Sequence, residues 1–199
     1  MMCGRPGWKP YYEPVAENPY LEDFYRDMER WAFASQVFFL THRVRSHRAL
    51  MEDSHAVVQD RSLYEDAEVF ARNLYLQGQL NERDYGSYRD LYQVLVDFLP
   101  PPDLVVYLRA PVATLVGRIQ QRGRVYERQI TAEYLGRLNE LYDDWINHFA
   151  LCPVLTVPAD ELNYVIHPGH LNLVAQKIQE KLTGKDLVIF APEEVENSR

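Results

Sequence analysis

Short apolar runs alternate with longer amphipathic stretches along this chain, and that alternation constrains its fold more than any other feature. Residues 104–108 are continuously apolar, which is typical of a strand buried on both faces of a parallel sheet. Further strands are predicted at residues 9–13, 55–59, 154–157 and 187–190. Helical periodicity is predicted at residues 24–51, 62–76, 84–99, 111–119, 131–149 and 171–182. The alternation predicts a parallel α/β fold with helices on both faces of the sheet.

The size and charge of the chain limit its class. A chain of 199 residues suits one domain, and the acidic, polar residues 192–199 predict a flexible tail. The net charge of −8 argues against a general nucleic-acid or membrane-surface binder, and no apolar run is long enough to span a membrane. The two cysteines, Cys3 and Cys152, fit no disulfide framework, so a reducing cytoplasm is expected.

Polar residues follow the first two predicted strands. Asp60-Arg61-Ser62 comes directly after residues 55–59, and Glu13 ends the first strand. Ligands bind at the carboxyl ends of parallel strands, where two carboxylates and a fixed cation suit phosphate chemistry. The carboxylates can divide the duties of proton acceptor and magnesium ligand. The simpler interpretation is that Asp60-Arg61-Ser62 caps a helix and that the acids face a loop.

An arginine cluster follows the helix predicted from residue 111. Its members repel one another unless an anion neutralises them, and arginine binds two phosphate oxygens at once. The cluster therefore predicts a phosphate lid. A solvated helix face, with Glu127 and Glu133 as partners, is the alternative. The members are Arg118, Arg122, Arg124 and Arg128.

A second polar set is predicted on helices that flank the same strand ends. Gln36 and Arg43 share one helix face because they lie seven residues apart, and Asp66 lies on the next predicted helix. An amide and an Arg–Asp pair can read the edge of a nucleobase. A buried structural salt bridge explains the pair equally well.

Together these motifs resemble the deoxynucleoside kinase family, which includes the deoxycytidine, deoxyguanosine and deoxyadenosine kinases. The similarity runs over residues 8–182, nearly the whole chain. Its motifs are specific in combination and occur in the family's order. They are Glu13-Pro14-Val15, Trp31 with Gln36 and Arg43, Asp60-Arg61-Ser62 with Asp66 and Phe70, and Arg118-x-x-x-Arg122-x-Arg124-x-x-Glu127.

The resemblance implies a role for each matching residue. Glu13 would be the general base for the sugar 5′-hydroxyl, Arg61 would hold that hydroxyl, and Asp60 would help to place Mg²⁺. Asp60 is a conservative departure from the glutamate of many animal members. Arg118, Arg122 and Arg124 would close over the ATP phosphates. The implied nucleoside contacts are Tyr25 and Glu127 for the sugar 3′-hydroxyl, and Gln36, Phe70, Trp31, Arg43 and Asp66 for the base.

The resemblance also implies a P-loop NTPase-like kinase fold and a homodimer. The Arg43–Asp66 pair favours deoxyadenosine or deoxyguanosine, with deoxycytidine as a further substrate. The family's first strand and its phosphate loop, G-x-x-x-x-G-K-[ST], should precede residue 8 and do not occur in this sequence. A misassigned start codon or a shortened chain explains this most simply. The alternatives are a non-catalytic nucleoside-binding subunit and a nucleoside monophosphate kinase.

Overall fold

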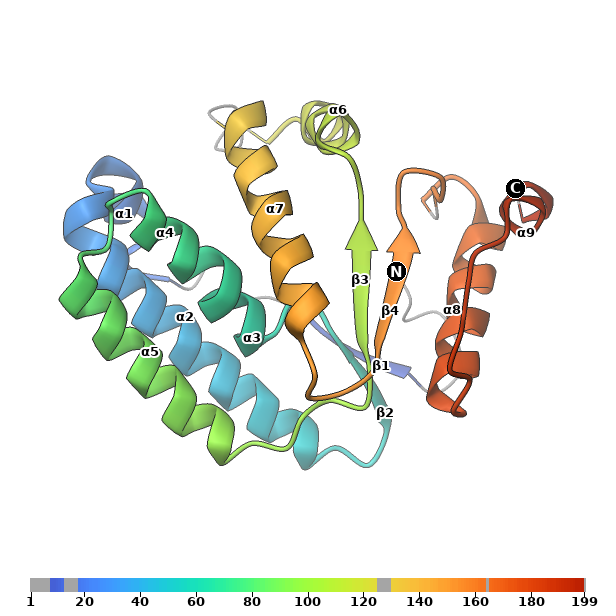
Figure 1. Cartoon of the computed structure of the whole chain (residues 1–199), viewed down its shortest axis with the longest axis horizontal. Coiled ribbons are helices and arrows are strands. Elements are labelled where there is room, and N and C mark those ends of the chain that lie inside the picture. Colours follow the sequence, from blue (N-terminus) through green and yellow to red (C-terminus); the bar gives the residue numbers. More distant parts are fainter. Residues whose placement is uncertain (1–7, 13–17, 125–129, 164, 199) are drawn as a thin grey trace. The chain divides into compact units, whose positions relative to one another are not determined.

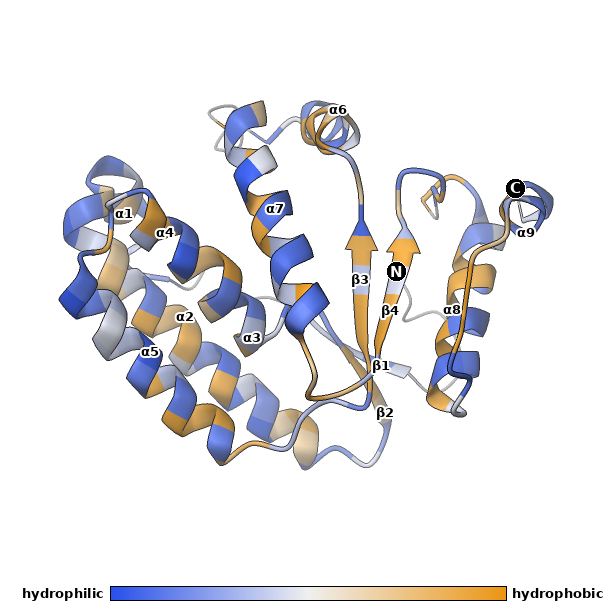
Figure 2. Ribbon diagram, viewed as in Figure 1, coloured by the Kyte–Doolittle hydropathy of each residue, from blue (hydrophilic) through white to orange (hydrophobic). Residues whose placement is uncertain are grey.

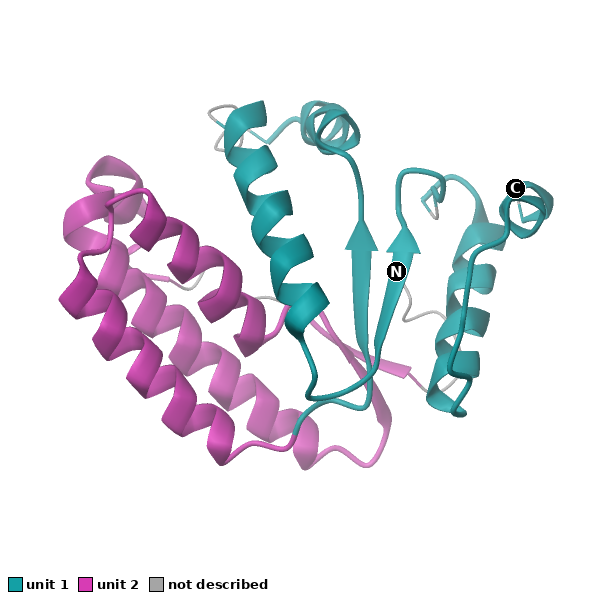
Figure 3. Ribbon diagram, in the orientation of Figure 1, with its two compact units in different colours: residues 1, 101–199 teal, residues 2–100 magenta. Residues whose placement is uncertain are grey.

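The structure is a computed structural model, and it describes residues 8–12, 18–124, 130–163 and 165–198. The chain divides into two compact units, residues 2–100 and residues 101–199 (Figure 3). Each unit carries its own parallel strand pair and its own helices (Figure 1). We therefore describe the N-terminal unit and the C-terminal unit one after the other.

The N-terminal unit is built on a parallel pair of strands. The strands β1 (Trp8–Tyr11) and β2 (Ala56–Gln59) run in register, with Trp8 opposite Ala56 and Tyr11 opposite Gln59. This confirms the predicted parallel pairing of the first two strands. Its helical segments are α1 (Leu21–Arg26), α2 (Met28–Met51), α3 (Leu63–Glu65), the π-helical η3 (Asp66–Ala71), α4 (Arg72–Leu76) and α5 (Glu82–Asp97).

The helix predicted from residue 24 is interrupted in the structure. It divides into α1 and α2 at Asp27, whose carboxylate accepts a hydrogen bond of 3.1 Å from the Arg30 N–H and so begins α2. The stretch predicted as one helix at residues 62–76 is helical throughout but contains the π-helical η3. Such turns are rare and are frequently found at functional sites.

The core of the N-terminal unit lies where α2, η3 and α5 pack together. In Figure 2, apolar positions recur along α2 and α4. Leu40 of α2, Val69 of η3 and Tyr88 of α5 are fully buried. Large side chains of this kind contribute roughly 1.5–3 kcal/mol each on burial. This packing fixes the faces of α2 and η3 that carry the candidate base-reading residues.

The C-terminal unit repeats the same arrangement around a second strand pair. The strands β3 and β4 are parallel, with Val105 opposite Val154, and α7 and α8 lie on opposite sides of them (Figure 1). The Thr131 hydroxyl accepts a hydrogen bond of 3.1 Å from the Tyr134 N–H, as predicted for the start of α7. The elements are β3 (Val105–Arg109), α6 (Val112–Arg122), α7 (Ala132–His148), β4 (Val154–Pro158), α8 (Pro168–Leu182) and α9 (Pro192–Asn197).

The apolar stripe of α7 belongs to the core of its own unit. Leu135, Leu138, Leu141 and Trp145 are all buried. Because these side chains are buried within one chain, the stripe contributes to the core.

Three sequence predictions are wrong in the C-terminal unit. Residues 187–190 form no strand and expose Leu187. β3 is only partly buried, because β4 is its one partner strand among the described residues. The segment predicted as a flexible tail is helical from Pro192 to Asn197.

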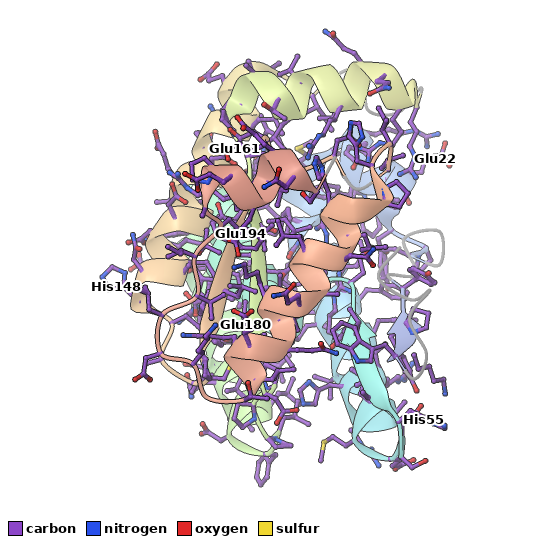
Figure 4. All side chains as sticks on the ribbon, turned by 90° about the vertical axis from the view of Figure 1, so that its right-hand side faces the viewer. Glu22, His55, His148, Glu161, Glu180 and Glu194 are labelled. Atoms are coloured by element: carbon purple, nitrogen blue, oxygen red, sulfur yellow. The ribbon has the colours of Figure 1, made fainter. Side chains whose placement is uncertain are left out.

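The helix α9 forms because two interactions hold it. Glu194, labelled in Figure 4, accepts a hydrogen bond of 3.1 Å from the Ala191 N–H at the start of α9. Its other oxygen lies 2.7 Å from the Nζ atom of Lys177, a buried lysine of α8. Val195 is buried against the unit as well. In the part of the chain that the structure describes, no helix is both long and apolar enough to cross a membrane.

Candidate functional site

The carboxyl ends of β1 and β2 bring the first candidate residues to one edge. The Asp60 N–H donates a hydrogen bond of 2.9 Å to the Tyr11 carbonyl, so the chain after β2 leaves beside the end of β1. Glu13 follows Tyr11 by two residues but lies outside the described residues. The Asp60 residue is exposed at this edge, so its carboxylate can reach a ligand from solvent.

Arg61 has an unusual backbone conformation. Its φ of 65° lies in the left-handed region, and no other described residue except glycine has a positive φ. An L-residue loses roughly 1–2 kcal/mol in this conformation, and such strain is concentrated at functional sites. The Arg61 Cζ atom lies 4.5 Å from the centre of the Phe70 ring, a cation–π contact. The strained backbone and the ring together hold an exposed guanidinium at the strand end.

Arg43 and Asp66 form a buried ion pair, which is the structural salt bridge that the sequence left open as the alternative to base recognition. The Arg43 Nε atom donates a hydrogen bond of 3.0 Å to Asp66 Oδ2, and both side chains are at most 6% exposed. The Arg43 Nη1 atom also lies 3.4 Å from the carbonyl oxygen of Asp60. The pair therefore connects α2 and η3 to the residue directly before Arg61.

Gln36 lies on the same face of α2. The residue is buried, with 6% of its surface exposed. A side-chain amide on the same helix face as a buried Arg–Asp pair is suited to bind the edge of a polar, planar ligand.

The aromatic candidates lie on α1 and at the start of α2. Trp31 is partly buried, and the Tyr20 ring stacks on it with centroids 5.8 Å apart. Tyr25 is 57% exposed on α1, beside Phe24 at 5.4 Å. Trp31 therefore belongs to an aromatic cluster, whereas Tyr25 faces solvent. The second candidate for the sugar 3′-hydroxyl, Glu127, lies outside the described residues.

The lid arginines belong to the C-terminal unit and have unequal surroundings. Arg118 is partly buried and donates a hydrogen bond to the Ala159 carbonyl, so one of its donors is used within the unit. Arg122 and Arg124 are exposed on either side of Gly123, which ends α6 with a φ of 69°. Arg122 and Arg124 are therefore the two lid arginines that face solvent.

The turn between Arg122 and Arg124 depends on glycine. Gly123→Ala is expected to lower the free energy of unfolding by about 1 kcal/mol, because alanine is disfavoured in the left-handed conformation. Gly117→Ala is the matched control, because it lies within α6 and a Cβ there meets nothing within 4 Å. That control is expected to stabilise α6 by roughly 0.5–1 kcal/mol. Urea unfolding of both variants checks the pair, and equal effects would contradict the assignment of Gly123.

Glu65 is a site feature that the sequence did not single out. It is partly buried, and one of its oxygens accepts a hydrogen bond of 3.3 Å from the Ser62 hydroxyl. Burial raises the pKa of Glu65 to about 7, although the positive charge of Arg61 opposes the shift. The spacing Ser62-x-x-Glu65 is the sequence signal that could have found it, since it is the pattern of a helix-capping box.

The pKa of Glu65 predicts how stability varies with pH. Between about pH 4.5 and pH 7 the folded protein retains a proton that the unfolded chain has lost, so stability falls as pH rises through this window. Glu65→Gln removes this fall in stability, because glutamine does not ionise. The variant is expected to gain about 1–3 kcal/mol on the parent between about pH 4.5 and pH 8. Urea unfolding across this range measures it, with the exposed Glu133→Gln as control. A gap between variant and parent that stays constant with pH would refute it.

Comparisons with known proteins identify the family. The sequence pattern of the family described as deoxynucleoside kinase matches residues 1–183. The deoxyadenosine/deoxycytidine kinase of Bacillus subtilis is 35% identical over 179 residues, which cover 89% of this chain and 82% of the relative. The deoxyguanosine kinase of Lactobacillus acidophilus is 33% identical over 186 residues, covering 88% and 80%.

Solved structures agree with the sequence comparison. The structure of deoxyadenosine kinase from M. mycoides with bound dATP has a TM-score of 0.74 and 31% identity, covering 86% of each chain. The same enzyme with the products dCMP and a flexible dCDP has a TM-score of 0.75. The predicted P-loop NTPase-like kinase fold is thereby confirmed. The chain belongs to the deoxynucleoside kinase family.

Proposed function

We propose that the protein transfers the γ-phosphoryl group of ATP to the 5′-hydroxyl of a deoxynucleoside, as a step of nucleotide salvage. The observation that carries the proposal is the buried set of Gln36, Arg43 and Asp66 directly beside Arg61. Gln36, Arg43 and Asp66 could read a base, and Arg61 could hold a phosphoryl oxygen, which supports the proposal. Membership of the deoxynucleoside kinase family supports the same reaction.

Purine deoxynucleosides are the preferred substrates in this proposal, with deoxycytidine as a further one. The Asp66 carboxylate can accept a hydrogen bond from an exocyclic amino group, which adenine and cytosine carry. Arg43 and Gln36 can donate to ring nitrogens or to the guanine carbonyl. Thymine offers a carbonyl and a methyl group where an amino group would bind, so a buried carboxylate disfavours it. The Bacillus subtilis relative acts on deoxyadenosine and deoxycytidine by its name, which supports this choice.

The reaction depends on positioning and on charge, since phosphoryl transfer requires little covalent chemistry from the protein. In our proposal Glu13 accepts the proton of the 5′-hydroxyl, and Arg61 stabilises the charge that develops on the phosphoryl group. Arg118, Arg122 and Arg124 bind the phosphates of ATP. Tyr25 and Glu127 hold the sugar 3′-hydroxyl, while Trp31 and Phe70 enclose the base.

Magnesium fits the candidate site through Asp60. No three His, Cys, Asp or Glu side chains among the described residues form a complete metal cage. Mg²⁺ usually binds one or two carboxylates together with phosphate oxygens and water, so the single exposed carboxylate of Asp60 suits it. Asp60 would hold the ion, which would supply positive charge to offset that of the phosphates.

We also propose a homodimer in the cytoplasm. The helix α5 supports a contact between copies, because Leu91, Val94 and the C-cap residue Phe98 are exposed at intervals of three and four residues.

A steady-state assay with ATP and Mg²⁺ tests the substrate proposal. It compares kcat/KM for the four common deoxynucleosides and for deoxyadenosine monophosphate. We expect deoxyadenosine or deoxyguanosine to be preferred over thymidine by at least about tenfold. Preference for the monophosphate would instead indicate a nucleoside monophosphate kinase.

A non-catalytic nucleoside-binding subunit is the second candidate function. The buried Gln36, Arg43 and Asp66 are compatible with it, because they could bind a nucleoside without any transfer of phosphate. Calorimetric titration distinguishes the two functions. Tight nucleoside binding without ATP binding would support the subunit, and strong ATP binding by this chain would exclude it.

A further inference from the structure

Asn18 is a buried residue whose side-chain amide is hydrogen-bonded at both ends. It lies three residues before the start of α1, and 7% of it is exposed. Its Nδ2 donates a hydrogen bond of 3.0 Å to the Ser35 hydroxyl, and its Oδ1 accepts one of 2.9 Å from the Tyr20 N–H. The two ends of one amide therefore connect two different segments of the N-terminal unit.

Both partners of Asn18 lead to the candidate base-reading face of α2. Ser35 is fully buried and directly precedes Gln36. Tyr20 stacks on Trp31 at 5.8 Å and contacts the Phe38 ring edge-on at 6.5 Å. Asn18 thus fixes the ring that covers Trp31 to the same turn of α2 that presents the Gln36 amide.

A turn-forming role alone does not account for these contacts. Asparagine before a helix commonly forms a turn in which only its side-chain oxygen accepts a backbone N–H. The bond to Tyr20 has this form, but the buried bond to Ser35 does not. Since a buried hydrogen-bond donor without a partner is unfavourable, the Asn18–Ser35 pair must stay together.

We propose that Asn18, through Ser35 and Tyr20, is a positioning residue for the base of the bound deoxynucleoside. The inference rests on the proposed function and adds a residue that touches no substrate. Loss of the pair would let Tyr20 and Trp31 shift relative to Gln36. Small misplacements of this kind weaken binding and catalysis severalfold to a hundredfold.

Two substitutions isolate the Asn18–Ser35 bond. Ser35→Ala removes only the tie to α2 and leaves the turn at Tyr20 intact, and alanine is favoured within helices. Asn18→Ala removes both bonds. Each is expected to raise the KM for deoxyadenosine about tenfold while the KM for ATP stays within about twofold. The double variant is expected to be no worse than Asn18→Ala, because both changes remove the same bond.

Asn81→Ala is the matched control. Asn81 begins α5 and also uses both ends of its amide, accepting from the Asp84 N–H at 2.9 Å and donating to the Asp84 carboxylate at 2.8 Å. It is exposed and belongs to no candidate site. Its loss is expected to lower the Tm by about 2–4 °C without changing either KM.

The outcomes separate this inference from the proposed function. A parent protein that phosphorylates deoxyadenosine, together with Ser35→Ala and Asn18→Ala variants that keep the parental KM, would overturn the inference alone. A parent that neither binds nor phosphorylates any deoxynucleoside would overturn the proposed function, and the inference with it. Ser35→Ala decides the matter if Asn18→Ala fails to fold.

Discussion

Arg61→Gly is expected to reduce kcat for deoxyadenosine by about 10³-fold or more while the protein remains as stable as its parent. Arginines that stabilise charge in phosphoryl transfer contribute about 10³–10⁵ in rate. Glycine adopts the left-handed conformation of Arg61 without strain, which gains about 1 kcal/mol. The loss of the cation–π contact with Phe70 costs a similar amount, so the two effects on the free energy of unfolding nearly cancel. Steady-state kinetics and urea unfolding of the same preparation measure both effects.

Arg61→Ala serves as the control for the backbone. It removes the same guanidinium but keeps the strain, so we expect the same loss of kcat with a lower free energy of unfolding than Arg61→Gly. A variant that loses stability and activity in proportion would contradict a catalytic role for Arg61. Full activity of Arg61→Gly would exclude that role outright.

Asp66→Ala is expected to lower the free energy of unfolding by about 3–5 kcal/mol, because it leaves the Arg43 guanidinium buried without its carboxylate. This is a large part of the stability of an ordinary domain, about 5–15 kcal/mol. The combined variant Arg43→Met, Asp66→Ala removes both charges and is expected to recover most of the loss. It is also expected to lose the discrimination against thymidine. Urea unfolding measures the stability of both variants, and kcat/KM for deoxyadenosine and for thymidine measures the discrimination.

An exposed ion pair provides the contrast. Arg109 and Asp143 form two hydrogen bonds of 2.9 and 2.8 Å, and the arginine holds the pKa of Asp143 below its ordinary value. Their side chains are 60% and 36% exposed, so Asp143→Ala is expected to cost about 1 kcal/mol or less. If Asp66→Ala and Asp143→Ala lowered the free energy of unfolding equally, burial of the Arg43–Asp66 pair would add nothing to its contribution to stability.

Periodicity and motif order predicted much of the fold. The face shared by Gln36 and Arg43 followed from a spacing of seven residues, and the structure buries both of them. The parallel pairing of β1 with β2 followed from the alternation of strands and helices, and the start of α7 close to residue 131 followed from helical periodicity. Local patterns succeed where the period of the backbone alone decides which side chains face the core.

The features that the sequence failed to predict depend on contacts between residues distant in sequence, which a local pattern does not report. Residues 187–190 are apolar, yet a strand needs a partner edge as well as suitable residues, and they pair with none of the described strands. Residues 192–197 form a helix because Lys177, distant in sequence, pairs with Glu194. The left-handed Arg61 and the raised pKa of Glu65 depend on packing around the strand end. Tertiary contacts therefore decided each of these cases.

Phosphoryl transfer from ATP to deoxyadenosine tests the central claim most directly. The assay uses radiolabelled ATP with Mg²⁺, and compares the 199-residue chain with the same chain joined to the residues encoded directly upstream of it. We predict labelled deoxyadenosine 5′-monophosphate, formed in at least one of the two preparations and reduced about 10³-fold by Arg61→Gly. Absence of labelled monophosphate from both, with every deoxynucleoside supplied, would contradict the assignment as a kinase.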